Sequence, residues 1–463
     1  MKHIFLLLTL FAFAACSTQQ KAIDPWKKAD EVLAQIKAPV FKQQDFLITD
    51  YGAVGDSITD CTEAFKKAIE ACHAAGGGRV VVPAGKFTSG AIHLKSNVNL
   101  HVTKEATILF SQDTKKYLPQ VYTRFEAIEL MNYSPLIYAY EQENIAITGE
   151  GTLNGQADPD HWWWWKGKWG HADAAYPARE QSQKEANERL KKMAEEGVPV
   201  HERVFGEGDF LRPNFIQPYK CKNVLIEGVT VLNSPMWIIH PVLSENVIIK
   251  DVKVISHGPN SDGCDPESSR NVLIEGCLFD TGDDCIAIKS GRDHDGRRVN
   301  VPSENIIVRN CVMKDGHGGV VIGSEVSGNV RNVFAENCEM SSPNLDRALR
   351  LKSNSRRGGI IENIYMRNIT VGTLAEAVLH VDMFYMKETG SYLPVVRNIE
   401  MKNVTSENSP YAIFINSDDS YPVENVVIEG CTFDNVAKGN LLKGYKNLKV
   451  TNVTINGEKA EMQ

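Results

Sequence analysis

A phrase that recurs every 20 to 35 residues is the feature of this sequence that most restricts its fold. Each copy begins with Asn, continues with alternating apolar residues and reaches a turn residue before a second short apolar run, as in Asn223-Val-Leu-Ile-Glu-Gly-Val. From Asn223 onward the starting asparagines lie 23, 25, 34, 27, 31, 35, 27 and 22 residues apart. The copies start at Asn144, Asn223, Asn246, Asn271, Asn305, Asn332, Asn363, Asn398, Asn425 and Asn447. A repeat of this period indicates one structural unit stacked many times.

The composition of the unit decides between the repeat architectures. Its short runs are rich in Val and Ile, alternate with a period of two, and are broken by Gly, Asn or Asp, which is typical of strands. Helical patterns do not separate the copies, which disfavours leucine-rich repeats and βαβ units. Unequal intervals suit a parallel β-helix, because a long loop can leave one corner without disturbing the stack. We therefore expect an all-β fold over residues 45–457, a single right-handed parallel β-helix whose coils stack about 4.8 Å apart.

The repeat also assigns structural roles to two residue types. The repeat asparagines are expected to form ladders at a turn, with hydrogen bonds from coil to coil. Four cysteines, Cys277, Cys311, Cys338 and Cys431, each lie six places after a repeat Asn, where other copies have Val or Ile. They are interpreted as stacked core residues, and not as metal ligands or disulfides.

Two segments depart from the repeat. Ala64, Phe65, Ala68, Ile69 and Cys72 fall on one helical face, which predicts a short N-terminal helix that caps the open end of the solenoid. Residues 156–215 form an insertion that holds five of the seven tryptophans, Trp162 to Trp165 and Trp169. These indoles can either stack on sugar rings or hold the insertion against the barrel, and the sequence leaves both interpretations open. Residues 458–463 are expected to be a C-terminal tail.

The N-terminus has the pattern of an export signal. A basic start is followed by about 10 apolar residues and by small residues directly before Cys16, as in a bacterial lipoprotein. We expect residues 1–16 to be a signal ending at Cys16, with lipidation of Cys16. Residues 17–44 are expected to be a polar tether with one short helical pattern, roughly from Trp26 to Ile36. The protein would then lie in the bacterial cell envelope and contact the membrane only through this anchor. A soluble exported protein with a chance cysteine is the alternative.

The net charge excludes one class of partner. Asp and Glu number 58 against 50 Lys and Arg, a formal charge of −8, so a general nucleic-acid binder is not expected. An acidic protein can still bind an acidic polymer through a locally basic cleft. Residues 346–357 provide one, with five cations against a single acid.

Polar clusters interrupt the repeat at intervals of about one coil. They are Asn260-Ser-Asp-Gly263, Gly282-Asp-Asp-Cys285, Asp315-Gly-His-Gly-Gly319 and Arg350-Leu-Lys-Ser353. Asp283 follows Asp262 by 21 residues, and His317 precedes Arg350 by 33. Because residues one coil apart lie above one another, we expect these side chains to form a column on one outer face.

The chemistry of this column is specific. Hydrolysis of a glycosidic bond needs one protonated carboxyl group for the leaving oxygen and one ionised carboxylate that activates water or attacks carbon. Asp262, Asp283 and Asp284 supply such groups, because mutual repulsion raises the affinity of one of them for its proton. Arg350 and Lys352 alternate by two, so both leave the same strand face, where they suit a substrate carboxylate.

These motifs resemble the four signatures of family 28 glycoside hydrolases, the polygalacturonases and their relatives. Asn233-Ser-Pro235 and Asp50-Tyr-Gly-Ala-Val-Gly55 are also similar to that family. The resemblance implies a right-handed β-helix and inverting hydrolysis of pectic α-galacturonosyl links, without a metal or another cofactor. Two departures are mild: Ser261 stands where Thr is usual, and Leu351 where Ile is usual.

The resemblance also implies the residue roles. Asp283 corresponds to the general acid, Asp262 and Asp284 to the pair that holds and activates water, and His317 to the group that tunes the acid. Arg350 and Lys352 would bind uronate, and Tyr385, one coil further, would assist them.

The expected enzyme is thus a monomeric glycosidase that acts on a galacturonate-containing pectic glycan. The long insertion before the catalytic coils would close one end of the groove and favour exo action. Two alternatives remain from the sequence: a calcium-dependent pectate lyase, and a noncatalytic pectin-binding lipoprotein on the same scaffold.

Overall fold

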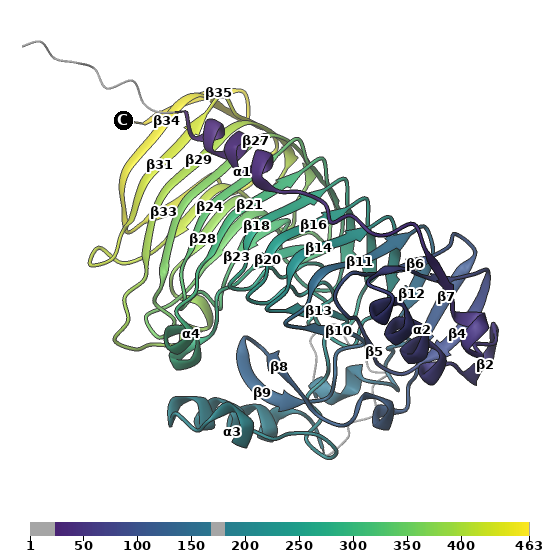
Figure 1. Cartoon of the computed structure of the whole chain (residues 1–463). Coiled ribbons are helices and arrows are strands. Elements are labelled where there is room, and N and C mark those ends of the chain that lie inside the picture. Colours follow the sequence, from purple (N-terminus) through teal and green to yellow (C-terminus); the bar gives the residue numbers. More distant parts are fainter. Residues whose placement is uncertain (1–23, 168–180, 463) are drawn as a thin grey trace, which may run out of the picture.

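The computed structural model describes residues 24–167 and 181–462, and most of them form one parallel β-helix (Figure 1). A 24-stranded sheet contains two of the faces of the solenoid. The first face carries the repeat asparagines, and its strands are β1 (Asp45–Leu47), β3 (Gly78–Val82), β6 (Val98–Val102), β11 (Glu143–Gly149), β14 (Lys222–Glu227), β16 (Glu245–Lys250), β18 (Arg270–Glu275), β21 (Ser303–Arg309), β24 (Val330–Glu336), β27 (Ile360–Thr373), β29 (Val395–Asn408), β31 (Val423–Glu429) and β34 (Tyr445–Ile455). The second face consists of β2 (Asp56–Asp60), β4 (Gly85–Ser89), β7 (Ala106–Phe110), β12 (Thr152–Asn154), β15 (Thr230–Leu232), β17 (Lys253–Ser256), β19 (Leu278–Thr281), β22 (Val312–Met313), β25 (Glu339–Met340) and β32 (Thr432–Phe433), together with the ends of β27, β29 and β34.

The third face of the solenoid is the one that matters for function, and we call it the groove sheet. Its strands are β5 (Ile92–His93), β10 (Ile137–Tyr140), β13 (Ile216–Tyr219), β20 (Ile286–Ile288), β23 (Val320–Ile322), β26 (Arg347–Lys352), β28 (Ala377–Asp382), β30 (Tyr411–Asn416) and β33 (Asn440–Lys443). Single bridges at residues 239–242 and 264–267 connect β13 to β20. The predicted all-β, right-handed parallel β-helix is confirmed.

The asparagine ladder is present as expected. The side chain of Asn332 donates to Asn305 at 3.1 Å and accepts from Asn363 at 3.1 Å. The same bond recurs on both sides, from Asn223 to Asn144 and from Asn398 to Asn363. These asparagines have φ near +57°, a left-handed conformation that Asn tolerates better than other residues with a side chain. One residue type therefore provides both the turn and the link between coils.

A ladder of alternating charge runs beside the asparagines, and the sequence analysis did not detect it. The residue before each repeat Asn alternates in sign through Lys222, Glu245, Arg270, Glu304, Arg331, Glu362, Arg397, Glu424 and Lys446. Arg270 pairs with Glu245 at 2.8 Å and Arg331 with Glu304 at 2.6 Å. Such pairing requires parallel strands in exact register, because a slip of one residue would move each charge away from its partner.

The short helix expected within the tether is present as predicted, but residues 25–36 are docked on the solenoid and do not form a free tether. Helix α1 (Pro25–Gln35) lies along the outside of the first face (Figure 1). Trp26, Val32 and Ile36 bury themselves against an outward apolar stripe whose members lie two places after each repeat Asn: Leu225, Ile248, Leu273, Ile307 and Phe334. An outward stripe of Leu and Ile is unfavourable in water, so its presence in the repeats was a sign that another segment covers it.

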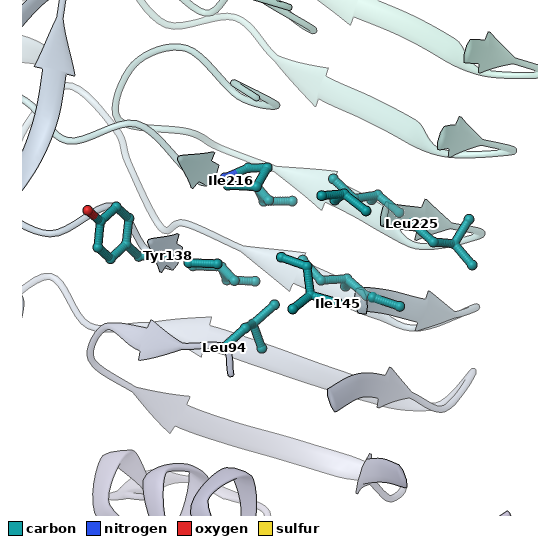
Figure 2. Close-up of a pocket in the computed structure, with 12 residues that line it drawn as sticks. Leu94, Tyr138, Ile145, Ile216 and Leu225 are labelled. Carbon is teal, nitrogen blue, oxygen red and sulfur yellow. The ribbon is translucent and has the colours of Figure 1, made fainter. Parts of the chain in front are cut away.

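The interior of the solenoid is filled by stacked aliphatic side chains. Figure 2 shows Leu94, Ile145 and Ile216 from successive coils around a void of about 10 Å³, about the size of one water sphere and too small for a ligand. The four repeat cysteines are buried and free in this core, as predicted. Each fully buried Val, Ile or Leu contributes about 1.5–3 kcal/mol relative to exposure.

Helix α2 (Thr62–Ala74) caps the N-terminal end of the solenoid (Figure 1). Its buried residues are the five predicted from the helical pattern. The expected C-terminal tail is instead a strand, β35 (Glu458–Met462), which pairs antiparallel with β34 and covers its edge. No helix in the described part of the chain is long and apolar enough to span a bilayer.

The insertion packs against the barrel through its tryptophans. Trp162 and Trp165 are buried in the main core, and the indole of Trp163 donates to the Ser234 carbonyl at 2.9 Å. These contacts support the structural interpretation of the indoles, while Trp169 lies outside the described residues. The insertion also contains α3 (Lys184–Glu195), which lies beside an unpredicted antiparallel hairpin, β8 (Val121–Phe125) and β9 (Ile128–Asn132) (Figure 1).

The ladder gives a direct stability test at Asn332. We expect Asn332→Ala to lower the free energy of unfolding by about 2–4 kcal/mol, because it loses two hydrogen bonds and strains a left-handed residue. Asn332→Gly keeps the backbone relaxed and should cost only about half as much. Urea denaturation followed by circular dichroism measures both, and equal losses in the two variants would contradict the backbone part of the argument.

Candidate active site

Strand register brings the predicted residues together. Parallel pairing on the groove sheet aligns Asp283 with His317, whose amide donates to the Asp283 carbonyl at 3.2 Å. One coil earlier, the amide of Gly263 donates to the carbonyl of Asp284, which places Asp262 beside Asp284. The sequence spacing of one coil therefore corresponds to lateral neighbours in space, as expected.

Three carboxylates form the centre of this site. Asp262, Asp283 and Asp284 each offer an oxygen atom, and these oxygens lie within 4.8 Å of one another. Their exposure differs: the side chain of Asp283 is 19% exposed, whereas those of Asp262 and Asp284 are 4% and 1% exposed. Asp283 is thus the carboxylate that a molecule in the groove meets first.

The predicted cation pair lies on one side of the carboxylates. Lys352 Nζ is 2.6 Å from Asp284 Oδ2, and Arg350 Nη1 is 3.4 Å from Asp284 Oδ1. Burial favours the neutral form of Asp284, but these two cations outweigh it and hold the pKa of its carboxyl below the ordinary value. Tyr385, in the short helical turn η5 (Tyr385–Lys387), lies over both cations, with its ring centre 5.2 Å from Lys352 Nζ and 5.6 Å from Arg350 Cζ.

His317 and Asp283 form an ion pair. His317 Nδ1 lies 2.9 Å from Asp283 Oδ1. The hydrogen bond and the charge of Asp283 raise the pKa of His317 to about 9. Burial acts to raise the pKa of Asp283, but His317, Lys352 and Lys289 outweigh it and lower that pKa. In the free protein this pair therefore shares one proton, which resides on the imidazole.

Asp262 is the member of the trio with the highest proton affinity. Burial and the neighbouring Asp283 raise its pKa to about 7, against the opposing charge of Lys289. Four protein cations, His317, Lys289, Arg350 and Lys352, thus balance the carboxylates of this site.

Lys289 and Asp265 were missed by the sequence analysis. Lys289 Nζ lies 3.3 Å from Asp262 Oδ2 and 3.5 Å from Asp265 Oδ1, and both residues are buried. The signal was present in the sequence: Lys289 follows Asp284 by five residues on an otherwise apolar strand, where a buried lysine requires carboxylate partners.

Arg212 is a second residue that the sequence did not reveal. It is 1% exposed, and it donates to the carbonyl of Pro259 at 2.6 Å and to Asn260 Oδ1 at 2.8 Å. Its Nε donates to Gln183 at the start of α3 at 3.2 Å. The end of the insertion therefore holds the loop that carries Asp262.

A wall closes the groove sheet on the N-terminal side of the carboxylates. The hairpin β8–β9 lies over this sheet, where Arg124 donates to Glu267 at 2.7 Å and Thr123 donates to Gln217 at 2.5 Å. Glu267 lies five residues after Asp262 in the same coil, so the wall contacts the coil that carries Asp262. Helices α3 and α4 (Asp293–Val299) support the hairpin from outside. The wall expected from the insertion is therefore present, but the hairpin forms its inner part.

A second group of potential ligands lies in a surface pocket beside His317. His257, Asp280 and Asp315 place one donor atom each within 4.8 Å of one another. Asp280 already pairs with His257 at 3.1 Å, and Asp315 accepts from Ser342 and Asn344. This group lies outside the catalytic column, and we assign no metal to it.

Comparisons with known proteins agree with this geometry. The family model described as "Glycosyl hydrolases family 28" matches residues 208–459, and one described as "Rhamnogalacturonase A/epimerase, pectate lyase-like" matches residues 46–102. A hyperthermoactive exopolygalacturonase from Thermotoga maritima is 49% identical, with a TM-score of 0.89 over 94% of this chain and 96% of that one. A family 28 exopolygalacturonase from Yersinia enterocolitica is 25% identical, with a TM-score of 0.69 over 90% of this chain and 80% of that one. The exo-poly-alpha-D-galacturonosidase of Dickeya chrysanthemi is 28% identical, covering 89% of this chain and 74% of its own.

The ion pair of His317 predicts an unusual titration. We expect its imidazole to titrate near pH 9, and Asp283→Asn to move that titration down toward the ordinary value of about 6.5, because the stabilising charge is lost. Proton–nitrogen NMR of the imidazole measures both values. When folding raises the pKa of a histidine, the histidine stabilises the folded protein most at pH values below its unfolded pKa. The difference in free energy of unfolding between the wild type and His317→Asn should therefore be largest below pH 6.5 and fade as the pH rises through 9. An unchanged titration in Asp283→Asn would contradict the pairing.

Proposed function

Because the chain belongs to glycoside hydrolase family 28, we propose that it hydrolyses α-galacturonosyl linkages of pectic polysaccharides or oligosaccharides from chain ends, with inversion. The observation that carries this proposal is the convergence of Asp262, Asp283 and Asp284 beside a buried cation pair. The named exopolygalacturonases among its relatives support the substrate class.

Substrate binding would use Arg350, Lys352 and Tyr385. In the free protein both cations contact Asp284, and an incoming uronate carboxylate offers them a second anionic partner. The guanidinium of Arg350 can bind a carboxylate through two parallel hydrogen bonds. The side chain of Arg350 is 10% exposed, and its contact with Asp284 is long, at 3.4 Å from Nη1 to Oδ1.

The proton for the leaving oxygen would come from the Asp283–His317 pair. The proton resides on His317 in the free protein, where both side chains are partly exposed. A bound sugar covers the pair and excludes water, which favours the neutral form of the pair, with the proton on Asp283, over the ion pair. Asp283 is then the general acid, and its greater exposure places it nearest the glycosidic oxygen.

Asp262 and Asp284 would hold and activate the attacking water. The carboxylate oxygens lie within 4.8 Å of one another, closer than the about 6.5–9.5 Å usual between the carboxyl groups of inverting enzymes. We nevertheless propose inversion, because Asp284 is engaged at both oxygens by cations and is poorly placed for direct attack on carbon. The anomeric form of the first product decides this point.

Exo action follows from the wall. The hairpin β8–β9 contacts the coil that carries Asp262 and lies over the groove sheet there, whereas β28, β30 and β33 continue this sheet toward the C-terminus (Figure 1). A substrate chain would therefore end at the wall and extend over the C-terminal coils. The two alternatives from the sequence, a calcium-dependent lyase and a noncatalytic binder, gain no support from the family match.

The proposal predicts the products of a defined substrate panel. We expect monomeric galacturonate alone to be released from oligogalacturonides, first as the β-anomer, and no unsaturated product absorbing in the ultraviolet. Asp283→Asn should lower kcat by about 10²- to 10⁴-fold while oligosaccharide binding is retained, because a general acid contributes about that much. Chromatography, NMR of the nascent product and calorimetry measure these quantities. A ladder of product lengths would contradict exo action, and release of the α-anomer would contradict inversion.

We further propose that the protein is an exported lipoprotein of the bacterial cell envelope, anchored through Cys16. This proposal rests on the basic start, the apolar stretch and the small residues before Cys16, which lie outside the described residues. Docking of α1 from Pro25 leaves residues 17–24 as the connection between the anchor and the solenoid.

The anchor predicts a change in fractionation. Cys16→Ser should move the protein from the membrane fraction to the soluble exported fraction and abolish labelling by a palmitate analogue, with specific activity unchanged. Immunoblotting of cell fractions measures this, with Cys61→Ser as the matched cysteine control. Membrane association that survives Cys16→Ser would contradict the anchor.

A further inference from the structure

Lys289 is a buried cation that the proposed mechanism does not use. Its side chain is 3% exposed, and it lies at the C-terminal end of β20, two coils before Lys352 at the same position in the coil. The ammonium group contacts Asp262 at 3.3 Å, Glu325 at 3.4 Å and Asp265 at 3.5 Å. It also lies 4.4 Å from the ring centre of Trp237, which shields it from water.

The surroundings of Asp262 explain why it needs a cation. Asp265, Asp283 and Asp284 face it, and all are carboxyl groups. Lys352 also acts on Asp262 but is bound to Asp284 at 2.6 Å. Asp265 is buried, and its pKa lies well above the ordinary value because of burial and of Asp262, so it is a neutral acid that adds no charge. Lys289 is therefore the cation in direct contact with Asp262.

The charge of Lys289 is divided between two partners. Burial favours the neutral form of Glu325, but Lys289, Arg292, Arg357 and Lys352 hold its pKa well below the ordinary value, so Glu325 is ionised. Arg292 approaches Glu325 at 4.0 Å and donates to Glu126 at the tip of the wall hairpin at 2.9 Å. A line of alternating charges thus runs from Asp262 through Lys289, Glu325 and Arg292 to the wall.

We propose that Lys289 is a positioning residue that keeps Asp262 ionised and oriented as the base of the reaction, and that Glu325 limits its effect. This inference rests on the proposed function of Asp262. Lys289 acts through Asp262 and is not assigned a contact with substrate. Removal of Lys289 leaves Asp262 surrounded by carboxyl groups, which raises the proton affinity of Asp262. Removal of the Glu325 charge makes Lys289 act more strongly on Asp262, which lowers that affinity.

The experiment compares opposite charge changes around Asp262. The acid limb of the kcat–pH profile reports the base in the substrate complex. Lys289→Met should move this limb up by about one pH unit or more, so that kcat is depressed at low pH and recovers at higher pH, with little change in KM. Glu325→Gln should move the limb down. Lys289→Arg should restore a profile close to that of the wild type.

Lys443→Met is the matched control. Lys443 occupies the same position in the coil on β33, further along the column through Lys352, Asp382 and Asn416, and is exposed away from the carboxylates. The Lys443→Met variant should have the kcat–pH profile of the wild type. Circular dichroism checks that each variant is folded. If Lys289→Met does not fold, the test rests on Glu325→Gln, in which the acid limb of the kcat–pH profile should move to lower pH.

The outcomes separate this inference from the proposed function. If the wild-type protein releases no product from oligogalacturonides, the proposed function is wrong. If the wild type is active but Lys289→Met and Glu325→Gln lower activity equally at every pH, or shift the acid limb in the same direction, only the proposed role of Lys289 is wrong. Opposite shifts support it, because a purely structural role would not give limbs that move apart.

Discussion

Strict register between parallel coils is the constraint on which the rest of the structure depends. A hydrogen-bonded parallel ladder places each residue directly beside its counterpart one coil away, so a one-residue slip would turn every side chain to the other face. The asparagine ladder maintains this register, since Asn332 donates to one neighbour and accepts from the other. The charge ladder depends on it as well, because a slip would separate paired side chains such as Arg270 and Glu245.

The same register assembles the active site and also brings like-charged carboxylates close together. It gathers several carboxyl groups in a buried place, where their repulsion would drive them to take up protons. The protein offsets this with cations supplied by the same coils: Lys289 for Asp262, Lys352 and Arg350 for Asp284, and His317 for Asp283. Each carboxylate thus has its own counter-ion, and the three differ in proton affinity although they lie within 4.8 Å.

The groove is shaped by segments that do not belong to the repeat. The hairpin β8–β9 is joined to the groove side of the solenoid by the buried ion pair of Arg124 with Glu267, and a second buried pair joins Arg203 of the insertion to Asp295 of α4. Buried pairs of this kind hold one arrangement, because breaking one leaves an uncompensated charge. The wall is therefore rigid and is continuous, through Arg292 and Glu325, with the charges around Asp262.

The sequence by itself determined the solenoid, its core and the column of catalytic and binding residues, because a periodic sequence forms the same strands and turns in each coil. The residues of that column are Asp262, Asp283, Asp284, His317, Arg350 and Lys352. Non-periodic contacts between distant segments could not be predicted in this way. The docking of α1 on Phe334 and the contact of the hairpin with Glu267 depend on packing between segments whose spacing in the chain carries no signal. Tertiary structure alone decided which segment forms the inner part of the wall and how proton affinity is distributed among the carboxyl groups, because both depend on burial and on charges brought together from different coils.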